Sequence, residues 1–139
     1  EVGQEKGATT GRRRRCGWLD LVALKQCVRV NSLTSICLTK LDVLDTLESI
    51  KLCTGYAYAG QVLTQLPIEI DVLEACVPIY ETLPGWQCVT ARCRQWSHLP
   101  TQAQSYIERI EGLIGVPISL VSTGADREDF VVRTHPLLA

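Results

Sequence analysis

The sequence lacks several features that would assign it to a familiar class of protein. Its 139 residues include no methionine, two histidines and one phenylalanine. No apolar run approaches the roughly 18–20 residues that a membrane-spanning helix needs, and the first residues, EVGQE, show no apolar core of a secretory signal. A phosphate-binding loop of the G-x-x-x-x-G-K-[ST] type is also missing. We therefore expect a cytoplasmic protein without membrane contact, and, because position 1 is not methionine, a piece of a longer chain.

The cysteines do not form a recognisable disulfide or zinc pattern. There are seven, which is an odd number, and no two have C-x-x-C spacing. Most lie among apolar neighbours, as in the stretch SICL at residues 35–38. This pattern predicts unpaired thiols in the core of a protein from a reducing compartment, and no metal site.

Positive charge is concentrated at the start of the chain. The composition is 46% hydrophobic and 21% charged, which is typical of a globular protein, and the net charge is −1. Residues 1–15 hold five basic residues against two glutamates, a net of +3, so residues 16–139 carry −4. A nucleic-acid-binding domain would be expected to have a basic face instead. The distribution therefore favours a local anion site, and we expect no nucleic-acid partner.

The order of helical and strand patterns indicates an α/β protein. Apolar residues at helical spacing predict one helix over about residues 19–31 and a second that begins at an N-cap, Thr101, and stops at Gly115. Short apolar runs at residues 35–39 and 116–121 are typical of strands covered on both faces, as in a parallel sheet. Further strands are predicted at residues 49–59, before a turn at 59–60, at 77–82 and at 129–133, whereas residues 57–76 match no motif.

Two loops that follow the predicted buried strands could bind a guanine base. Asp42, in the stretch TKLD, could accept the two adjacent donors of guanine, N1–H and the exocyclic amine, with one ionised carboxylate. The stem of Lys40 could lie along the base. The loop Ser122-Thr123-Gly124 could aim backbone N–H groups at O6 of guanine. Both loops would lie at the same sheet edge if the strands are parallel; surface charges and a plain turn are the alternative interpretations.

The stretch GATTGRRRR at residues 7–15 is interpreted as an anion-binding loop. Thr9 and Thr10 supply hydroxyls, and Gly11 lets backbone N–H groups approach an anion. The arginines that follow can form bidentate hydrogen bonds with a carboxylate or phosphate. Adjacent side chains alternate in an extended loop, so Arg12 and Arg14 are expected to share a face. A solvated basic patch or a nuclear-localisation signal is the alternative, but the sequence turns at once into a pattern typical of folded structure.

Five motifs together resemble one family of enzymes. They are GATTGRRRRCGWLD at 7–20, NSLTSICLTKLDVLD at 31–45, PIYETLPGW at 78–86, LPTQAQSYIERIE at 99–111 and STGADR at 122–127. In this order they resemble the C-terminal third of adenylosuccinate synthetase, in its bacterial form more than its animal form. The resemblance implies that residues 1–139 are the C-terminal portion of one domain, with a P-loop-NTPase-like mixed or parallel sheet and flanking helices.

The resemblance also implies an activity. The family is a GTP-dependent ligase of purine biosynthesis that joins IMP and L-aspartate with the help of Mg²⁺, generally as a homodimer. GTP phosphorylates the 6-oxygen of IMP, and the amine of aspartate then displaces phosphate. The catalytic residues and the metal ligands of the family lie in its N-terminal part, so we expect none in this chain, and we expect this chain to be inactive alone.

Binding residues follow from the motif matches. The loop that matches residues 8–14 holds aspartate, the arginine at position 12 also reaches IMP, and the arginine at position 14 lies near the GTP phosphates. The aspartate and IMP residues are thus Ala8, Thr9, Thr10, Gly11, Arg12, Arg13 and Arg14. The GTP residues are Arg14, Lys40, Leu41, Asp42, Ser122, Thr123 and Gly124.

The chain departs from the family pattern in one of these motifs. Ala125 stands where the bacterial pattern has proline, and neither His98 nor His135 fits the role of the family's catalytic histidine. Two other functions stay open at this point. One is a guanine-nucleotide-binding module without chemistry of its own; the other is a nucleic-acid-binding module, which the acidic balance of residues 16–139 disfavours.

Overall fold

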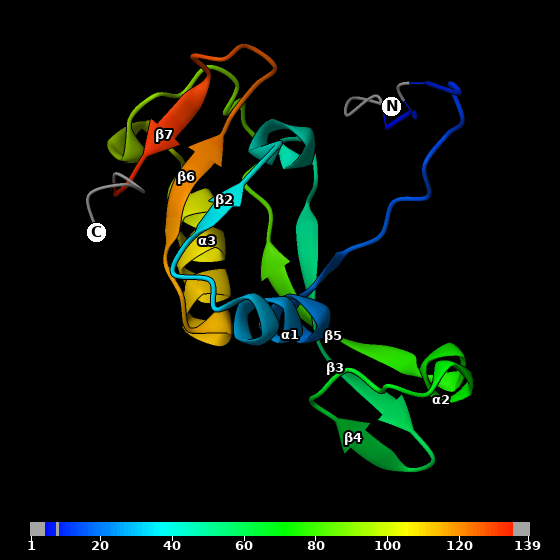
Figure 1. The fold of residues 1–139 in the computed structure, drawn as a ribbon. Helices are drawn as coiled ribbons and strands as arrows, with labels where there is room; N and C mark the ends of the chain where they lie inside the picture. The colour runs from blue at the N-terminus through cyan, green and yellow to red at the C-terminus, as the bar shows by residue number, and fades with distance from the viewer. Residues whose placement is uncertain (1–4, 8, 135–139) are drawn as a thin grey trace.

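The computed structural model describes residues 5–7 and 9–134, and it has two sheets with helices packed against them (Figure 1). The strands are β1 (Leu19–Asp20), β2 (Ile36–Leu38), β3 (Ser49–Tyr58), β4 (Gln61–Leu63), β5 (Val77–Pro84), β6 (Ile118–Ser122) and β7 (Phe130–Val132). The helices are α1 (Leu21–Asn31), α2 (Ile70–Ala75) and α3 (Thr101–Ile114), with short 3-10 turns η1 (Leu41–Leu44) and η2 (Trp96–His98). This is a mixed α/β architecture, as predicted.

The two sheets combine parallel and antiparallel pairs. In the first, β3 is the long central strand, parallel to β1 and antiparallel to β4 and β5. In the second, β6 lies between β2, to which it is parallel, and β7, to which it is antiparallel. The β3–β4 turn at residues 59–60 and the edge strand β7 confirm two predictions. Among the described residues β2 pairs on one side only, and its middle residue is exposed, so the predicted burial of both faces is wrong for this strand.

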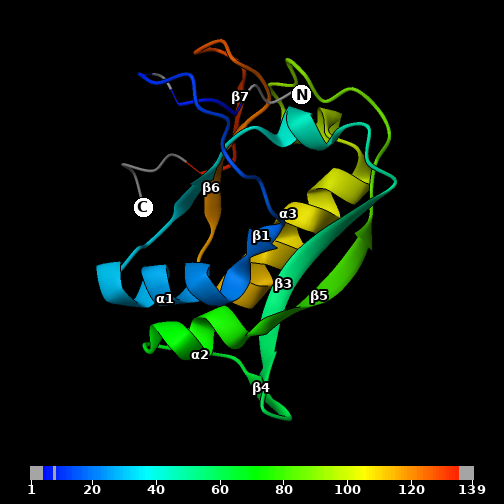
Figure 2. The ribbon, with the colours of Figure 1, turned by 90° about the vertical axis from the view of Figure 1, so that its right-hand side faces the viewer.

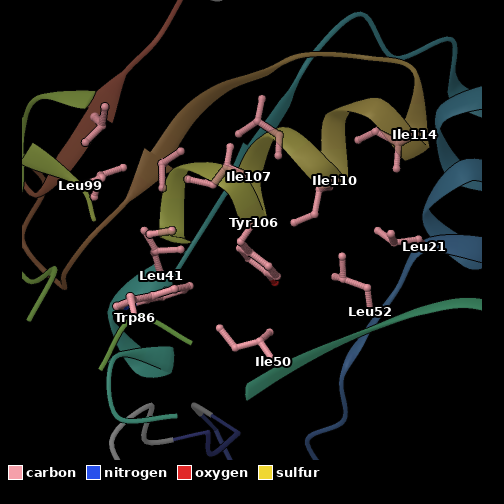
Figure 3. Close-up of a cluster of buried hydrophobic side chains, with 14 residues drawn as sticks. Leu21, Leu41, Ile50, Leu52, Trp86, Leu99, Tyr106, Ile107, Ile110 and Ile114 are labelled. Carbon is pink, nitrogen blue, oxygen red and sulfur yellow. The ribbon is translucent and has the colours of Figure 1, made fainter. Parts of the chain in front are cut away.

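Helix α3 lies between the two sheets and supplies much of the core (Figures 2 and 3). Its buried residues fall three or four positions apart and form one stripe: Ala103, Tyr106, Ile107, Ile110 and Ile114. Side chains from β3, β6, β7 and the first turn of α1 pack against this stripe. Burial of aliphatic side chains is worth roughly 1.5–3 kcal/mol each, so this cluster holds the two sheets in a fixed relation.

The helix ends correct two predictions. Helix α1 begins at Leu21 rather than 19, because Asp20 is its N-cap and its carboxylate accepts hydrogen bonds from Val22 N (2.9 Å) and Ala23 N (3.0 Å). Thr101 is the first residue of α3 and not its N-cap; Pro100 occupies the cap position without a side-chain cap. The predicted stop at Gly115 is confirmed, since its φ of 80° is left-handed.

All seven cysteines lie in the described part of the chain and all are unpaired, as predicted. The expectation that they occupy the core is wrong for most of them. Only Cys53 is buried, Cys76 and Cys93 are intermediate, and the others are exposed. Apolar neighbours misled this inference, because in a strand such as β2 alternate residues point to opposite faces, and Cys37 faces outward.

Residues 57–76, which match no motif, extend away from the core as the end of β3, β4 and α2 (Figure 1). The six-residue helix α2 was missed by the sequence reading. Several large apolar side chains are exposed on this extension, among them Val62, Ile68 and Ile70. Within residues 5–7 and 9–134, no helix is both long and apolar enough to cross a membrane.

Candidate functional site

The two loops predicted to bind a base lie beside each other. β2 and β6 are parallel neighbours, with Ile36 opposite Ile118 and Leu38 opposite Val121. The first loop (residues 40–42) therefore leaves the carboxyl end of β2 next to the second loop (residues 122–124) at the end of β6, which is the edge where open α/β sheets bind ligands. The predicted adjacency is confirmed.

Asp42 in the first loop is positioned by the two residues that precede it. Lys40 has a left-handed backbone, with φ of 59°, which turns the chain sharply after β2. Leu41 is 1% exposed and anchors η1 in the core. Asp42 then follows with its Oδ1 buried, and this oxygen accepts no hydrogen bond from any residue that the structure describes. A buried acceptor without a partner is costly, so this oxygen is suited to a ligand that brings a donor.

An open cavity of about 700 Å³ lies against Asp42 and the second loop. Its walls come from three parts of the chain: η1, the segment 91–94 and the turn that begins at Gly124. The lining residues are Asp42, Ala91, Arg92, Arg94, Gly124, Ala125, Asp126 and Asp129. The cavity therefore joins the two predicted base-binding loops in one space large enough for a nucleobase.

Thr123 and Gly124 in the second loop are tightly packed. Thr123 is fully buried, its amide N–H donates to Asp129 O (2.9 Å) and its hydroxyl donates to Cys93 O (2.8 Å). A Cβ on Gly124 would come within 2.6 Å of Asp129 Oδ2, so a side chain does not fit here. The Ser122 hydroxyl donates to Gly124 O (3.0 Å) and closes the turn. Such a loop presents backbone groups at a fixed position.

Asp45 connects the first loop to segment 91–94, which forms what we call the third wall of the cavity. Its carboxylate accepts hydrogen bonds from Trp86 Nε1 (2.7 Å), Thr90 N (2.7 Å) and Thr90 Oγ1 (2.6 Å). Two residues further on, Arg92 N donates to Thr123 O (3.3 Å). Segment 90–94 is thereby fixed to η1 on one side and to the second loop on the other.

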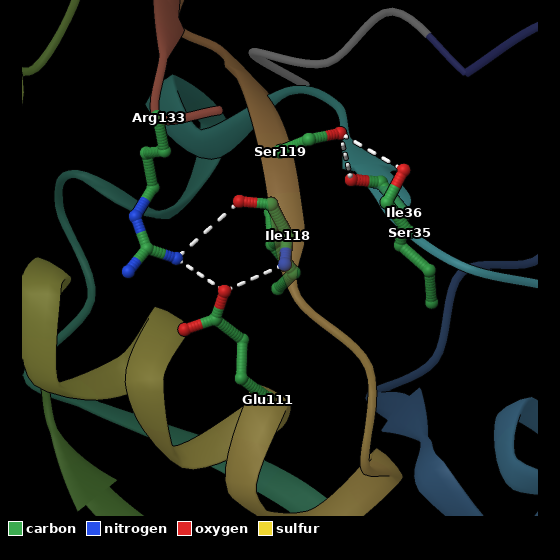
Figure 4. A network of polar contacts seen from close by, with 6 residues as sticks. All are labelled: Ser35, Ile36, Glu111, Ile118, Ser119 and Arg133. Atoms are coloured by element: carbon green, nitrogen blue, oxygen red, sulfur yellow. Dashed lines mark hydrogen bonds and ion pairs between the residues drawn. The ribbon is translucent and has the colours of Figure 1, made fainter. Parts of the chain in front are cut away.

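A polar network braces β6, the strand that carries the second loop (Figure 4). The Glu111 carboxylate accepts from Ile118 N (2.6 Å) at the start of β6 and forms an ion pair with Arg133. The guanidinium of Arg133 also lies over the ring of Trp96, 4.1 Å from its centre. These contacts join α3, the start of β6, η2 and the residue that follows β7.

The described part of the arginine loop (residues 7 and 9–15) lies close to the first loop. Its chain folds back on itself, since Gly7 N donates to Arg12 O (2.8 Å) and Gly11 N donates to Gly7 O (2.9 Å). The Glu5 carboxylate contacts Lys40 Nζ and lies 3.6 Å from Arg14 Nη1. Arg14 from the predicted anion-binding loop and Lys40 from the predicted base-binding loop therefore both contact the Glu5 carboxylate.

The Glu5 side chain is charged in this arrangement. The hydrogen bond from Lys40 and the charge of its ammonium hold the pKa of Glu5 below its usual range. The other described residues of this loop that are predicted to bind aspartate and IMP are exposed, as a ligand would need in order to reach them. They are Thr9, Thr10, Gly11, Arg12 and Arg13. Ala8 and His135, which the sequence reading also named, lie outside the described residues.

Sequence reasoning missed one wall of the cavity. Segment 91–94 has neither helical nor strand periodicity, so no pattern in the sequence placed it beside Asp42. The only signal is a pair of arginines, Arg92 and Arg94, two positions apart. Asp45 was also not singled out, although it ends the motif LDVLD that carries Asp42.

Metal-ligating side chains do not converge in this part of the chain. Over residues 5–7 and 9–134, no group of three or more histidine, cysteine, aspartate or glutamate side chains could hold a metal ion. The carboxylates around the cavity are spread along its walls, and Asp129 pairs with Arg94 at 3.7 Å. The described residues therefore do not fit a complete magnesium site.

Comparisons with known proteins agree with the motif pattern. The adenylosuccinate synthetase family matches residues 1–131. The chain is 52% identical over 138 residues to an adenylosuccinate synthetase from Albidiferax ferrireducens, covering 99% of this chain and 30% of that protein. It is 49% identical over 136 residues to the enzyme from Dechloromonas aromatica, covering 98% and 31%.

A solved structure has the same fold. The fully ligated adenylosuccinate synthetase from Plasmodium falciparum superimposes with a TM-score of 0.91 at 38% identity, over 95% of this chain and 32% of that one. The chain thus spans about a third of the length of the relatives it matches. Its two parallel strand–loop units, its sequence motifs and these likenesses agree, and the chain belongs to the adenylosuccinate synthetase family.

Proposed function

We propose that the protein containing this chain is a GTP-dependent ligase that joins IMP and L-aspartate to form adenylosuccinate, and that this chain supplies the guanine-binding and aspartate-binding loops. Family membership and about 50% identity to bacterial relatives support the activity. One observation carries the assignment to these loops. The buried Oδ1 of Asp42 has no partner among the described residues and lies beside a cavity shared with the second loop.

The proposed recognition of GTP rests on complementary hydrogen bonds. The Asp42 carboxylate accepts N1–H and the exocyclic amine of guanine, while adenine offers no such pair of adjacent donors. Backbone N–H groups of the second loop donate to O6. The aliphatic stem of Lys40 lies along the base, and its ammonium is held at the far end by Glu5. The Glu5 carboxylate also keeps Arg14 near the first loop, where the Arg14 guanidinium can reach the GTP phosphates.

The arginine loop is proposed to bind the two anionic substrates. L-Aspartate carries two carboxylates, and exposed guanidiniums with nearby hydroxyls can pair with each of them. Arg12 serves aspartate and also IMP, with Ala8, Thr9, Thr10, Gly11 and Arg13 completing the loop. Because Glu5 joins this loop to Lys40, both substrates and the nucleotide would meet on one side of the molecule.

The reaction has two balanced steps. In the first step N1 of IMP gives up its proton, the γ-phosphoryl group of GTP passes to the 6-oxygen, and GDP leaves. In the second step the aspartate amine attacks C6 and loses a proton, and phosphate departs with the former 6-oxygen. Mg²⁺ belongs to this proposal, but the residues described here do not form a site for it, so its ligands are placed elsewhere in the longer protein. A homodimer in the cytoplasm, in keeping with the seven unpaired thiols, completes the proposal.

The direct test is product formation by the full-length protein. Adenylosuccinate absorbance is followed with GTP, IMP and aspartate present, and then with each omitted in turn. We expect product only with all three, and little product when ATP replaces GTP. Equal rates with ATP would contradict the role of Asp42. Binding of GTP without any product would instead favour the alternative of a non-catalytic guanine-nucleotide-binding module.

A further inference from the structure

Arg92 has a backbone conformation that an arginine rarely adopts. Its φ is 66°, in the left-handed region that favours glycine. Its amide N–H donates to Thr123 O at 3.3 Å, so the strained residue is fixed against the second loop. The side chain is exposed and makes no contribution to the core. Strained residues cluster at binding sites, which makes a role in packing a poor explanation for an arginine here.

The charges around the cavity leave the guanidinium of Arg92 available. The neighbouring arginine on the same wall, Arg94, is paired with Glu128 (3.4 Å) and Asp129 (3.7 Å). Arg92 also lines the cavity, but its side chain makes no ion pair or hydrogen bond with residues 5–7 or 9–134. Five N–H donors of one side chain therefore border a cavity that also contains a buried acceptor, Asp42 Oδ1.

We infer that Arg92 is a specificity-determining residue that donates hydrogen bonds to the O6/N7 edge of the guanine base. The inference rests on the proposed function. Asp42 satisfies the donors of the base, and the second loop uses one of the two lone pairs of O6. An arginine, which has donors only, complements the acceptors that remain, namely N7 and the second lone pair of O6. O6 and N7 are adjacent acceptors whose spacing matches the fork of a guanidinium. Arg92, on the third wall of the cavity, would then bind the O6/N7 edge of the base, which Asp42 does not contact.

The test compares GTP with 7-deaza-GTP, which lacks the N7 acceptor, in the full-length enzyme. The variant Arg92→Gly removes the guanidinium and suits the left-handed backbone, so it should fold. The matched control is Gln87→Gly, because Gln87 is exposed, has φ of 45° and does not line the cavity. Arg92→Lys keeps the charge without the fork. Nucleotide Kd is measured for each variant, and a thermal melt checks folding.

We expect the parent enzyme and Gln87→Gly to bind GTP more tightly than 7-deaza-GTP, by about 10- to 100-fold, the range of the one charged hydrogen bond to N7 that is lost. Arg92→Gly should bind the two nucleotides equally, and Arg92→Lys should lose most of the difference. The inference is overturned if the parent enzyme does not distinguish them, or if Arg92→Gly still does. Either result can coexist with a preference for GTP over ITP, the inosine analogue, which tests Asp42 and the proposed function separately.

Discussion

Replacing Asp42 with asparagine should abolish the GTP preference that we propose for the full-length protein. The carboxylate has two acceptor oxygens, whereas the amide has one acceptor and one donor group. In Asp42→Asn the oxygen can still accept N1–H of guanine, but the NH₂ group then faces the exocyclic amine. One hydrogen bond is lost, and two donors are placed in contact at a position where Oδ1 is buried.

The size of the effect follows from the two hydrogen bonds. A hydrogen bond to a charged group contributes about 1.5–3 kcal/mol net. The variant loses one such bond, weakens the other by removing the charge and gains a donor–donor contact. We expect GTP binding to weaken by about 3 kcal/mol, which is roughly 100-fold in Kd. ITP lacks the exocyclic amine, so its affinity should fall less.

Competition binding with four nucleotides is the appropriate assay. The parent enzyme should prefer GTP over ITP, and Asp42→Asn should bind both with similar affinity. XTP carries an oxygen in place of the exocyclic amine, so it should gain affinity in the variant, because the new amide NH₂ can donate to that oxygen. ATP is the negative control. An unchanged ratio of GTP to ITP affinity in Asp42→Asn would refute the assignment of this carboxylate to guanine.

Three further substitutions test other parts of the structure. Arg12→Leu should raise KM for aspartate about 10- to 100-fold with little change for GTP, because a guanidinium–carboxylate pair is lost; Arg15→Leu is the control, and an unaltered aspartate requirement would count against the loop. Asp45→Ala should lower the free energy of unfolding by about 2–4 kcal/mol, since three hydrogen bonds disappear, whereas the exposed Asp71→Ala should change it by less than about 0.5 kcal/mol; equal denaturant midpoints for the two variants would be inconsistent with this role. Burial raises the pKa of Tyr106 to about 12, above about 10 in an unfolded chain, so the unfolded state loses its proton first. The contribution of the Tyr106 phenol to the free energy of unfolding is therefore complete below pH 10, and it declines by about 2–3 kcal/mol as the pH rises toward 12. In Tyr106→Phe this decline in the free energy of unfolding between pH 10 and 12 should be absent from denaturant unfolding curves. Identical pH profiles for the parent protein and the variant would show that burial does not perturb this phenol.

The parts of the site predictable from the sequence are those that depend on local patterns. Two short apolar runs predicted strands, and each is followed by a loop with residues suited to a base. Parallel strands bring their carboxyl ends to the same edge, so the strand assignment predicted the adjacency of Asp42 and Gly124 on the condition that the two strands are parallel, which the structure shows. The order of motifs then identified the family, which single loops do not specify.

Predictions that depended on fine placement were less successful. Thr101 has the side chain of an N-cap, but the chain enters α3 through Pro100, and Gln104 bonds the preceding carbonyls of Trp96 and Leu99 instead. Apolar neighbours suggested a buried Cys37, yet the alternation of β2 turns it outward. In both cases the residue type was compatible with two positions, and only the packing of distant segments selects one of them.

The third wall of the cavity shows most clearly why part of a binding site is hidden in a sequence. Segment 90–94 has no regular structure, and its position is set by Asp45, 45 residues before Thr90, and by Thr123, 30 residues after Cys93. Each of these contacts is a hydrogen bond between polar groups that have no periodic pattern. Because the wall is fixed at both ends, a change at Asp45 should loosen Arg92 and the second loop together, although it touches neither. The specificity of the site would then depend in part on segment 90–94, which lies outside the motifs that identify the family.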